Sequence, residues 1–360
     1  MGKRTIIPFG PQHPVLPEPV HLDLVMEDEK VVQAIPRIGY IHRGLEHLTE
    51  KKDFKQMVFV AERICGICCF GHSVGYASAV ENLMGIEIPP RAKYLRGIWQ
   101  ELERIHSHIL WLGLLADGFG FESLFMHCWR LRERVLDVLE QTSGGRVIVS
   151  ANVVGGVFKD IPNEQMPGII EQLDSIREDY EAISRAFLDD QSVNNRLREV
   201  GVLSRQDAVD LSCLGPMLRA SGVAEDVRLY EEPYATLGFT PITSDEGDCY
   251  ARCKVRINEV TQSIDLIKAM ADTIPDGELS TPLKGNPPAG SQGFYRVEQP
   301  RGESFYYVRG NGTKFLDRMR VRTPTSMNLA GMTRILQGCD LADVPMMVLT
   351  IDPCISCSER

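Results

Sequence analysis

Four of the ten cysteines fall into two C-x2-C pairs, Cys65/Cys68 and Cys354/Cys357. The two-residue spacer turns both sulfurs of a pair to one side, so that a single metal can bind both. Together the pairs offer four thiolates, which zinc, iron, nickel and iron–sulfur clusters accept. Cys354 stands 286 residues after Cys68 (354 − 68), so only the whole fold can bring the pairs together. The spacing leaves open a structural four-cysteine zinc site, a redox dithiol and a catalytic metal.

Five scattered cysteines are interpreted as buried thiols, because free cysteine commonly packs as a small hydrophobe. Cys249 and Cys253 stand four residues apart and would share one helix face. No third ligand stands near them, and two thiolates do not close a metal site. The five are Cys128, Cys213, Cys249, Cys253 and Cys339.

Composition and charge exclude several classes of protein. The chain has 360 residues, 39 basic and 49 acidic side chains and a net charge of −10. An acidic balance argues against nucleic acid as a partner. The longest apolar runs, residues 109–116 and 344–351, are shorter than the roughly 18–20 residues of a membrane span. The first residues lack the apolar stretch of a secretory signal. We therefore expect a soluble cytoplasmic chain, which does not exclude docking on a membrane partner.

The two ends of the chain show short β-like runs. Residues 5–8, 20–26 and 31–38 alternate with Pro and Gly punctuation, and residues 294–297 and 304–308 are typical of a hairpin. A last helix is expected over about 327–338, and the apolar run 344–351 is interpreted as a strand.

The middle of the chain has a helical pattern. Apolar residues recur every three or four positions, which predicts amphipathic helices. Four such segments run through residues 95–112, 128–138, 169–187 and 260–270. Long helices separated by loops are typical of a bundle.

These elements predict a mainly α fold with small β elements (α+β), in which a central helix bundle has short β-sheets and a hairpin near the two ends. Because both cysteine pairs must meet, we expect a single domain over residues 1–360. Its parts are a β-rich segment with the first pair (1–88), the helix bundle (89–272) and a C-terminal segment with the second pair (273–360).

The sequences around the cysteines resemble a known family. RICGIC followed by His72, with DPCISC near the other end, resembles the large, catalytic subunit of nickel–iron hydrogenases. The segments GPQHP, HRGLE, PRG and RTPTSMN agree with this along essentially the whole chain. The closest resemblance is to the energy-converting, membrane-bound (group 4, Ech-type) branch, which is related to the 49 kDa/D subunit of complex I. The resemblance implies the hydrogenase large-subunit fold.

The resemblance also implies a ligand set. All four cysteines would bind nickel, with Cys65 and Cys354 terminal and Cys68 and Cys357 bridging to an iron that carries one CO and two cyanides. Cys354 is the expected first proton acceptor. The chain would hold no iron–sulfur cluster of its own.

Four further residues follow from the resemblance as cofactor contacts or catalytic groups. His72 would hydrogen-bond a bridging sulfur, although a histidine in a core often binds only a backbone carbonyl. Arg301, after Pro300 in the PRG segment, would overhang the open metal face as a fixed fork of donors. Thr325, with Ser326 as the alternative, would donate to a cyanide, although ordinary helix capping also explains a hydroxyl there.

Two glutamates complete the expected site. Glu18, held between two prolines, matches the carboxylate that carries the proton away from the terminal thiolate. Glu46 matches the position where many relatives bind an extra magnesium or iron together with a C-terminal histidine. This chain ends in Ser358-Glu359-Arg360 and has no histidine after His127. A salt bridge from Glu46 to Arg360 is the alternative to that metal.

The function that the resemblance implies is reversible reduction of protons to H2. Electrons would pass from reduced ferredoxin through a ferredoxin-like iron–sulfur subunit and a small subunit with a [4Fe–4S] cluster. Integral membrane subunits would pump ions, and maturation proteins would assemble the metal centre, with the chain held at the cytoplasmic side of the cell membrane. Two alternatives are a complex I-type quinone-site subunit without metal, which leaves the four thiols unexplained, and a structural zinc protein.

Overall fold

A computed structural model describes residues 4–360. The strands β1 (Arg4–Phe9), β2 (His21–Glu27) and β3 (Lys30–Arg37) form an antiparallel sheet in that order. Leu22, Leu24 and Met26 of β2 are buried and alternate with half-buried residues, so one face of the sheet lies on the core. The strands predicted near the N-terminus are confirmed.

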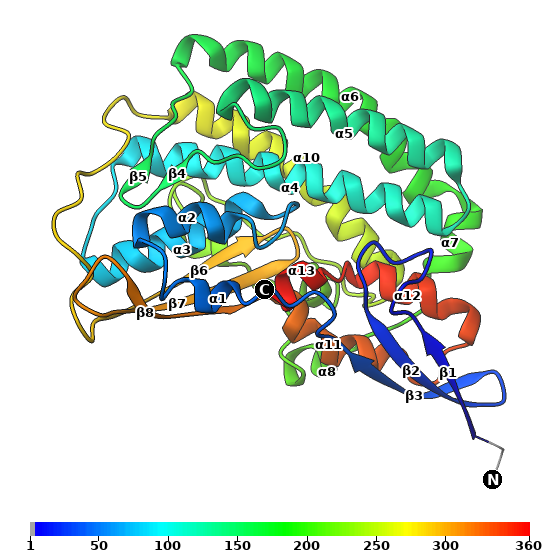
Figure 1. Cartoon of the computed structure of the whole chain (residues 1–360). Helices are drawn as coiled ribbons and strands as arrows, with labels where there is room; N and C mark the ends of the chain where they lie inside the picture. The colour runs from blue at the N-terminus through cyan, green and yellow to red at the C-terminus, as the bar shows by residue number, and fades with distance from the viewer. Residues whose placement is uncertain (1–3) are drawn as a thin grey trace.

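Four long helices form a bundle along one side of the molecule (Figure 1). They are α4 (Pro90–Gly118), α5 (Glu122–Ser143), α6 (Met166–Asp189) and α10 (Cys249–Thr273). α4 packs against both α5 and α10, and α6 packs against α5 and α10. The apolar positions that predicted the helices are their buried faces. All four predicted helices are confirmed.

Shorter elements connect these helices. They are strands β4 (Asn152–Val153) and β5 (Gly156–Val157), and helices α7 (Gln191–Leu197), α8 (Arg205–Asp210) and α9 (Pro216–Arg219). Single 3-10 turns lie at Asn163–Gln165, Val227–Tyr230 and Leu341–Asp343.

The C-terminal segment begins with a second antiparallel sheet, β6 (Gln292–Gln299), β7 (Gly302–Gly310) and β8 (Leu316–Arg322). It confirms the predicted hairpin and adds a third strand. The last predicted helix is α11 (Pro324–Ile335), followed by α12 (Val344–Ile351) and α13 (Ile355–Ser358). The strand predicted over 344–351 is wrong, because this run is the helix α12. α12 packs against α4 and α10 and seven of its eight residues are buried, so it lacks the polar face by which a helix is recognised.

The β-rich description of residues 1–88 is correct only for the first part. The rest holds α1 (Leu45–Leu48), α2 (Phe54–Glu62) and α3 (Cys69–Met84). α3 lies between α4 and the β6–β7 hairpin and is buried on nearly every side. Gly75 permits this packing, since a Cβ there would lie 2.5 Å from the Tyr306 ring. A helix enclosed on all sides shows no amphipathic stripe.

One cluster of buried hydrophobic side chains includes both Phe9 in β1 and Ile355 in α13. In Figure 1, α13 lies near the middle of the molecule, close to the C-terminus. Within residues 4–360, no helix has the length and apolar character that crossing a bilayer requires.

Candidate metal centre

The sulfur atoms of the two C-x2-C pairs meet in one buried cluster, within 4.8 Å of one another. The Sγ atoms of Cys65 and Cys354 are 3.4 Å apart, and those of Cys68 and Cys357 are 3.2 Å apart. Each cysteine is at most 3% exposed. Among the residues that the structure describes, no other group of three or more His, Cys, Asp or Glu is placed to hold a metal.

Helix starts and one arginine position the two cysteine loops. Cys68 is the residue before α3, and Cys354 is the residue before α13. The Arg43 guanidinium donates to the carbonyl of Ile64 at 2.7 Å and to that of Ser356 at 3.0 Å. Arg43, from the HRGLE segment, therefore fastens the loops to each other.

The charges of the sulfurs fit a bound cation. Hydrogen bonds from Cys354 and the other two cysteines hold the pKa of Cys65 well below its usual value. Hydrogen bonds within the cluster raise the pKa of Cys68, and burial raises the pKa of Cys357. Four thiolates therefore do not coexist in this pocket without positive charge. Soft, polarisable donors fit nickel and iron as well as zinc.

His72 lies against the bridging-ligand candidate Cys357. Its Nε2 is 3.2 Å from the Cys357 Sγ, and its Nδ1 is hydrogen-bonded to the Tyr306 hydroxyl. Burial lowers the pKa of His72 to about 4, so the ring is neutral and carries one N–H. With Tyr306 donating to Nδ1, that N–H points at the sulfur.

Arg301 is 5% exposed and reaches the site from the β6–β7 turn, directly after the buried Pro300. Its Nη2 donates to Asp352 Oδ1 at 2.7 Å and its Nε to the Asp352 carbonyl at 3.0 Å. Nη1 contacts the Ser107 hydroxyl at 3.3 Å. Asp352 was not among the predicted residues, although it stands two positions before Cys354 in the DPCISC motif.

The two hydroxyl candidates differ in their contacts. Thr325 Oγ1 accepts a hydrogen bond from the Cys354 N–H at 3.0 Å, so its own proton remains available to a ligand. Ser326 Oγ pairs with Thr323 Oγ1 at 2.9 Å. Of the two, Thr325 lies at the cysteine cluster.

Glu18 reaches the second cysteine pair from the loop between β1 and β2. Its carboxylate accepts hydrogen bonds from the N–H groups of Ile355 and Ser356 and from the Ser356 hydroxyl. The residue is half-buried. A carboxylate is thus held one residue beyond Cys354.

Glu46 makes the salt bridge that was the alternative to an extra metal. Its carboxylate lies 2.9 Å from Arg360 Nε and 2.9 Å from Arg320 Nη1, and it accepts from the Val321 N–H at 3.0 Å. Burial raises the pKa of Glu46, but these hydrogen bonds and charges outweigh it and lower the pKa overall. Two guanidinium groups occupy the carboxylate, an arrangement that does not fit a magnesium or iron ion.

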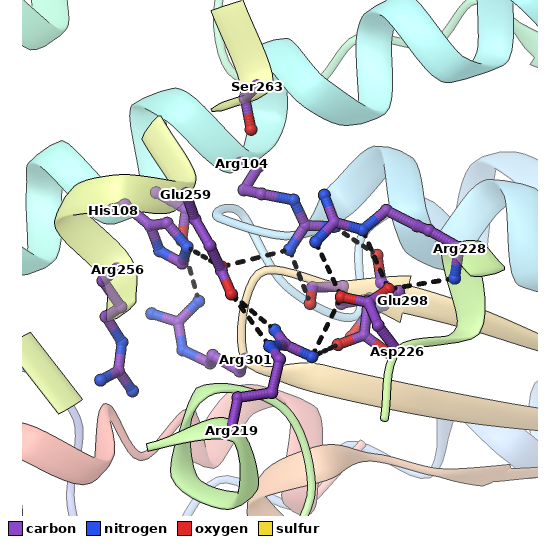
Figure 2. A network of polar contacts seen from close by, with 12 residues as sticks. Arg104, His108, Arg219, Asp226, Arg228, Arg256, Glu259, Ser263, Glu298 and Arg301 are labelled. Carbon is purple, nitrogen blue, oxygen red and sulfur yellow. Dashed lines mark hydrogen bonds and ion pairs between the residues drawn. The ribbon is translucent and has the colours of Figure 1, made fainter. Parts of the chain in front are cut away.

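A network of buried ion pairs lies beside Arg301 (Figure 2). Glu259 of α10 is 2.8 Å from His108 of α4 and 2.8 Å from Arg219 of α9. Arg219 is also 2.8 Å from Glu298 of β6. The network continues through Glu101, Arg104, Asp226 and Arg228. Because its members come from distant segments, no local sequence pattern indicates it. Paired in this way, the charges tolerate burial and join five elements beside the site: α4, α9, α10, β6 and the 3-10 turn at Val227–Tyr230.

Two family models match the chain. One, described as respiratory-chain NADH dehydrogenase, 49 Kd subunit, matches residues 118–288 and 282–360. The other, described as nickel-dependent hydrogenase, matches residues 43–116, which include the first cysteine pair.

Similar proteins carry names of both kinds. The membrane-bound hydrogenase subunit alpha of Pyrococcus furiosus is 39% identical over 98% of this chain and 87% of its own length. The carbon monoxide-induced hydrogenase of Rhodospirillum rubrum is 38% identical over 98% of this chain and 99% of its own. One of the NADH-quinone oxidoreductase subunits of Rhizobium etli is 34% identical over 98% of this chain and 94% of its own.

Proposed function

We propose a function for this chain from its family. The chain belongs to the family that includes the large subunits of membrane-bound nickel–iron hydrogenases and the 49 kDa subunits of complex I. Within that family, we infer that it is the catalytic subunit of a multisubunit membrane-bound [NiFe] hydrogenase. The reaction is the reversible conversion of two protons and two electrons to H2. The observation that carries this proposal is the buried cluster of four sulfurs within 4.8 Å.

Two features favour this function over the alternatives. A quinone-site subunit without metal needs none of the four converging thiols. A structural zinc site needs no further polar groups, whereas here His72 and Arg301, both buried, lie beside the sulfurs. A single buried guanidinium held by Asp352 is the kind of fixed charge that stabilises a reacting group.

In the proposed site, Cys65, Cys68, Cys354 and Cys357 would hold nickel, and Cys68 and Cys357 would also hold an iron with one CO and two cyanides. When bound, such a centre supplies the Lewis acidity and redox chemistry that cleave or form H2. Cys354 accepts the proton. Glu18, which binds the N–H of Ile355 directly after Cys354, passes the proton on. His72 orients Cys357, while Thr325 and Arg301, after Pro300, would hold the diatomic ligands and the proton in position when the centre is bound.

The proposed assembly follows from the chain's own contents. All four paired cysteines bind the one proposed centre, which leaves no cysteine pair for an iron–sulfur cluster. Electrons must therefore arrive from another subunit. We propose a small subunit with a [4Fe–4S] cluster, a ferredoxin-like subunit that takes electrons from reduced ferredoxin, and membrane subunits that move ions. The chain would lie at the cytoplasmic side of the membrane as a peripheral subunit, after loading by maturation proteins.

The test is elemental analysis combined with infrared spectroscopy on the purified complex. We expect one nickel and iron in the large subunit, bands of iron-bound CO and cyanide, and H2 evolution with a reduced low-potential donor. A single zinc with no nickel and no such bands would replace this proposal by the structural one. Quinone-dependent activity with neither metal would favour the complex I type.

A further inference from the structure

We propose that Glu103 carries protons between the four-cysteine site and a solvent cavity beside α3 and α4, as a second route in addition to Glu18. This inference rests on the proposed function, since it assigns a proton path to that same site.

Glu103 is a carboxyl group enclosed next to the first cysteine pair. It lies on α4 and is 1% exposed. Its oxygens accept hydrogen bonds from the N–H groups of Phe70, at 2.5 Å, and Gly71, at 3.0 Å, in the first turn of α3. No lysine, arginine or histidine among residues 4–360 forms an ion pair with it. Burial is the main cause that raises its pKa to about 8, so the group holds its proton at neutral pH.

The packing of α3 against α4 places Glu103 about one helical turn from a cavity. Glu103 contacts α3 at Gly71, and Arg96, earlier on α4, contacts α3 at Ser78 and Glu81. The two helices are therefore antiparallel. Between these contacts lie Gln100 on α4 and Val74 on α3, each three residues and roughly 4.5 Å from the Glu103 level. Val74 and Gln100 both line the cavity.

The cavity measures about 630 Å³ and reaches the surface, where Tyr230 and Phe294 on its rim are 66% and 62% exposed. Its wall offers another carboxyl group, Glu231, which accepts a hydrogen bond from the Tyr295 hydroxyl at 2.9 Å. Burial raises the pKa of Glu231 to about 8. A space of this size that opens to the surface and carries several polar side chains has room for water, with which Glu231 would exchange protons near neutral pH.

The side-chain amide of Gln299 lies with Glu103 at Gly71. A Cβ on Gly71 would meet Gln299 Cγ at 2.9 Å and Glu103 Oε2 at 3.2 Å, so both side chains pack on this glycine. Gln299 Oε1 accepts from the Ser304 hydroxyl at 2.7 Å, whereas its buried Nε2 has no partner within the described chain. An unpaired donor next to a carboxyl group is a polar gap of the kind that water or a transferred proton fills.

The chemical step moves one proton and no electrons. Glu103 releases its proton toward the cysteine site during H2 formation and takes another from cavity water by way of the Gln100 side. Each H2 consumes two protons, so a route at each cysteine pair matches the stoichiometry. The two routes lie on different elements, Glu18 on the β1–β2 loop and Glu103 on α4.

The experiment compares Glu103→Gln with the wild-type complex by three measurements. Nickel and iron content with the CO and cyanide bands shows whether the centre is assembled. Infrared absorption of protonated carboxylic acids shows whether Glu103 holds a proton at pH 7. Exchange between H2 and D2O measures proton delivery. We expect an assembled centre, loss of one protonated-acid band, and exchange slowed about ten-fold, because the Glu18 route must then deliver both protons. This is less than the roughly 10²–10⁴-fold cost of a general acid whose loss is not compensated.

Two companion variants sharpen the result. Glu232→Gln, at the cavity rim and 3.0 Å from Lys93, is the control and should leave exchange unchanged. Gln100→Leu leaves Glu103 and both its amide donors in place but makes the cavity floor apolar, and should also slow exchange. Gln100→Leu provides the test if the metal centre does not assemble in Glu103→Gln.

Unchanged exchange in Glu103→Gln or in Gln100→Leu would overturn the inference, as would absence of a protonated-acid band that Glu103→Gln removes. A wild-type complex without nickel, CO bands or exchange would instead overturn the proposed function, and this inference with it. If only the inference about Glu103 fails, the wild-type complex still works as a hydrogenase. If the proposed function fails, the wild-type complex shows neither the metals nor the exchange, so the two failures are distinguishable.

Discussion

The two cysteine loops are built alike, yet their carboxyl partners differ. In each loop a cysteine, Cys68 or Cys354, directly precedes a helix whose first consecutive N–H groups donate to one glutamate. Ile355 and Ser356 donate to Glu18, and Phe70 and Gly71 donate to Glu103. Such amides favour an anion. Glu18 is half-buried on a loop and gains a third donor, the Ser356 hydroxyl. Glu103 is sealed between helices, and there burial outweighs the two amides.

Because Glu18 and Glu103 differ in burial, we assign the two glutamates different tasks in proton transfer. A loop carboxylate at the edge of the site is in place to hand protons outward. A sealed carboxylic acid that keeps its proton at neutral pH is in place to supply one. The comparison predicts unequal effects for changes at the two loops.

The largest effect is expected at the sulfurs themselves, where the loops are equivalent. Cys65→Ser and Cys354→Ser should each abolish H2 turnover and lower nickel content, because a serine hydroxyl is a hard, poorly ionised substitute for thiolate. Metal analysis and H2 assays check this. Cys249→Ser is the matched control, since that buried thiol lies on α10 outside the cluster. Normal turnover in either ligand variant would remove that cysteine from the centre.

Glu18→Gln should come next. The amide keeps the size and can accept the Ile355 and Ser356 hydrogen bonds, but it does not carry a proton, so H2 production and H/D exchange should fall by roughly 10³-fold. Nickel, iron and the infrared bands of the centre should stay normal. A loss no larger than that of Glu103→Gln would show that the two routes are interchangeable, which would end the assignment of separate tasks.

Arg301→Lys tests the group that faces both loops. Lysine keeps the charge but loses the planar fork that binds the Asp352 carbonyl and carboxylate together. We expect normal metal loading with turnover reduced by roughly 10²-fold, the effect of removing a preorganised donor. Asp352→Asn should show part of the same loss. Wild-type turnover in Arg301→Lys would remove Arg301 from the reacting site.

The sequence indicated the residues that stand in short motifs on both loops, but it did not indicate Glu103. The paired cysteines, Glu18 and Arg301 stand in short motifs that a resemblance carries over residue by residue. Glu103 stands in a charged stretch of α4 that is typical of a solvated helix face, and only its contact with Phe70 shows that it is buried. Its role depends on tertiary packing, which local spacing does not encode.

The same physical reason explains the errors in the elements. Amphipathic helices such as α5 and α6 bury one face, so their period is visible in the sequence. α3 and α12 are buried nearly all round and show no period. These two helices are also the ones that lead into Cys354 or away from Cys68, so the hardest segments to predict are those that position the cysteine cluster.

Gly71→Ala should have a smaller effect, confined to the N-terminal loop. A Cβ would press on Gln299 and Glu103, and overpacking costs about 1–3 kcal/mol, whereas replacing a helical glycine by alanine gains up to about 1 kcal/mol. We expect a net loss of about 1–2 kcal/mol in the free energy of unfolding and slower H/D exchange. Gly168→Ala, in α6 with no atom within 4 Å, is the control and should be neutral or stabilising. A stabilised Gly71→Ala would mean that the contact at Glu103 is loose.

The smallest effect is expected at Glu46, which joins the C-terminal tail, through Arg360, to Arg320 and Val321 of β8. Its folded-state pKa is lowered, so its contribution is present above the unfolded pKa and is lost as the pH falls through the folded one. Glu46→Gln should therefore lower the free energy of unfolding at pH 7 by about 1 kcal/mol, the typical net contribution of one hydrogen bond, and the difference from wild type should shrink under acid conditions. Denaturant unfolding at pH 7 and in acid measures this, with Glu50→Gln, whose nearest arginine nitrogen is 3.8 Å away on Arg318, as the control. Because two guanidiniums hold Glu46, the variant should also leave magnesium and iron contents unchanged. Loss of one equivalent of either metal in Glu46→Gln would show that the carboxylate binds a cation after all, and that the tail is tied by metal rather than by Arg360.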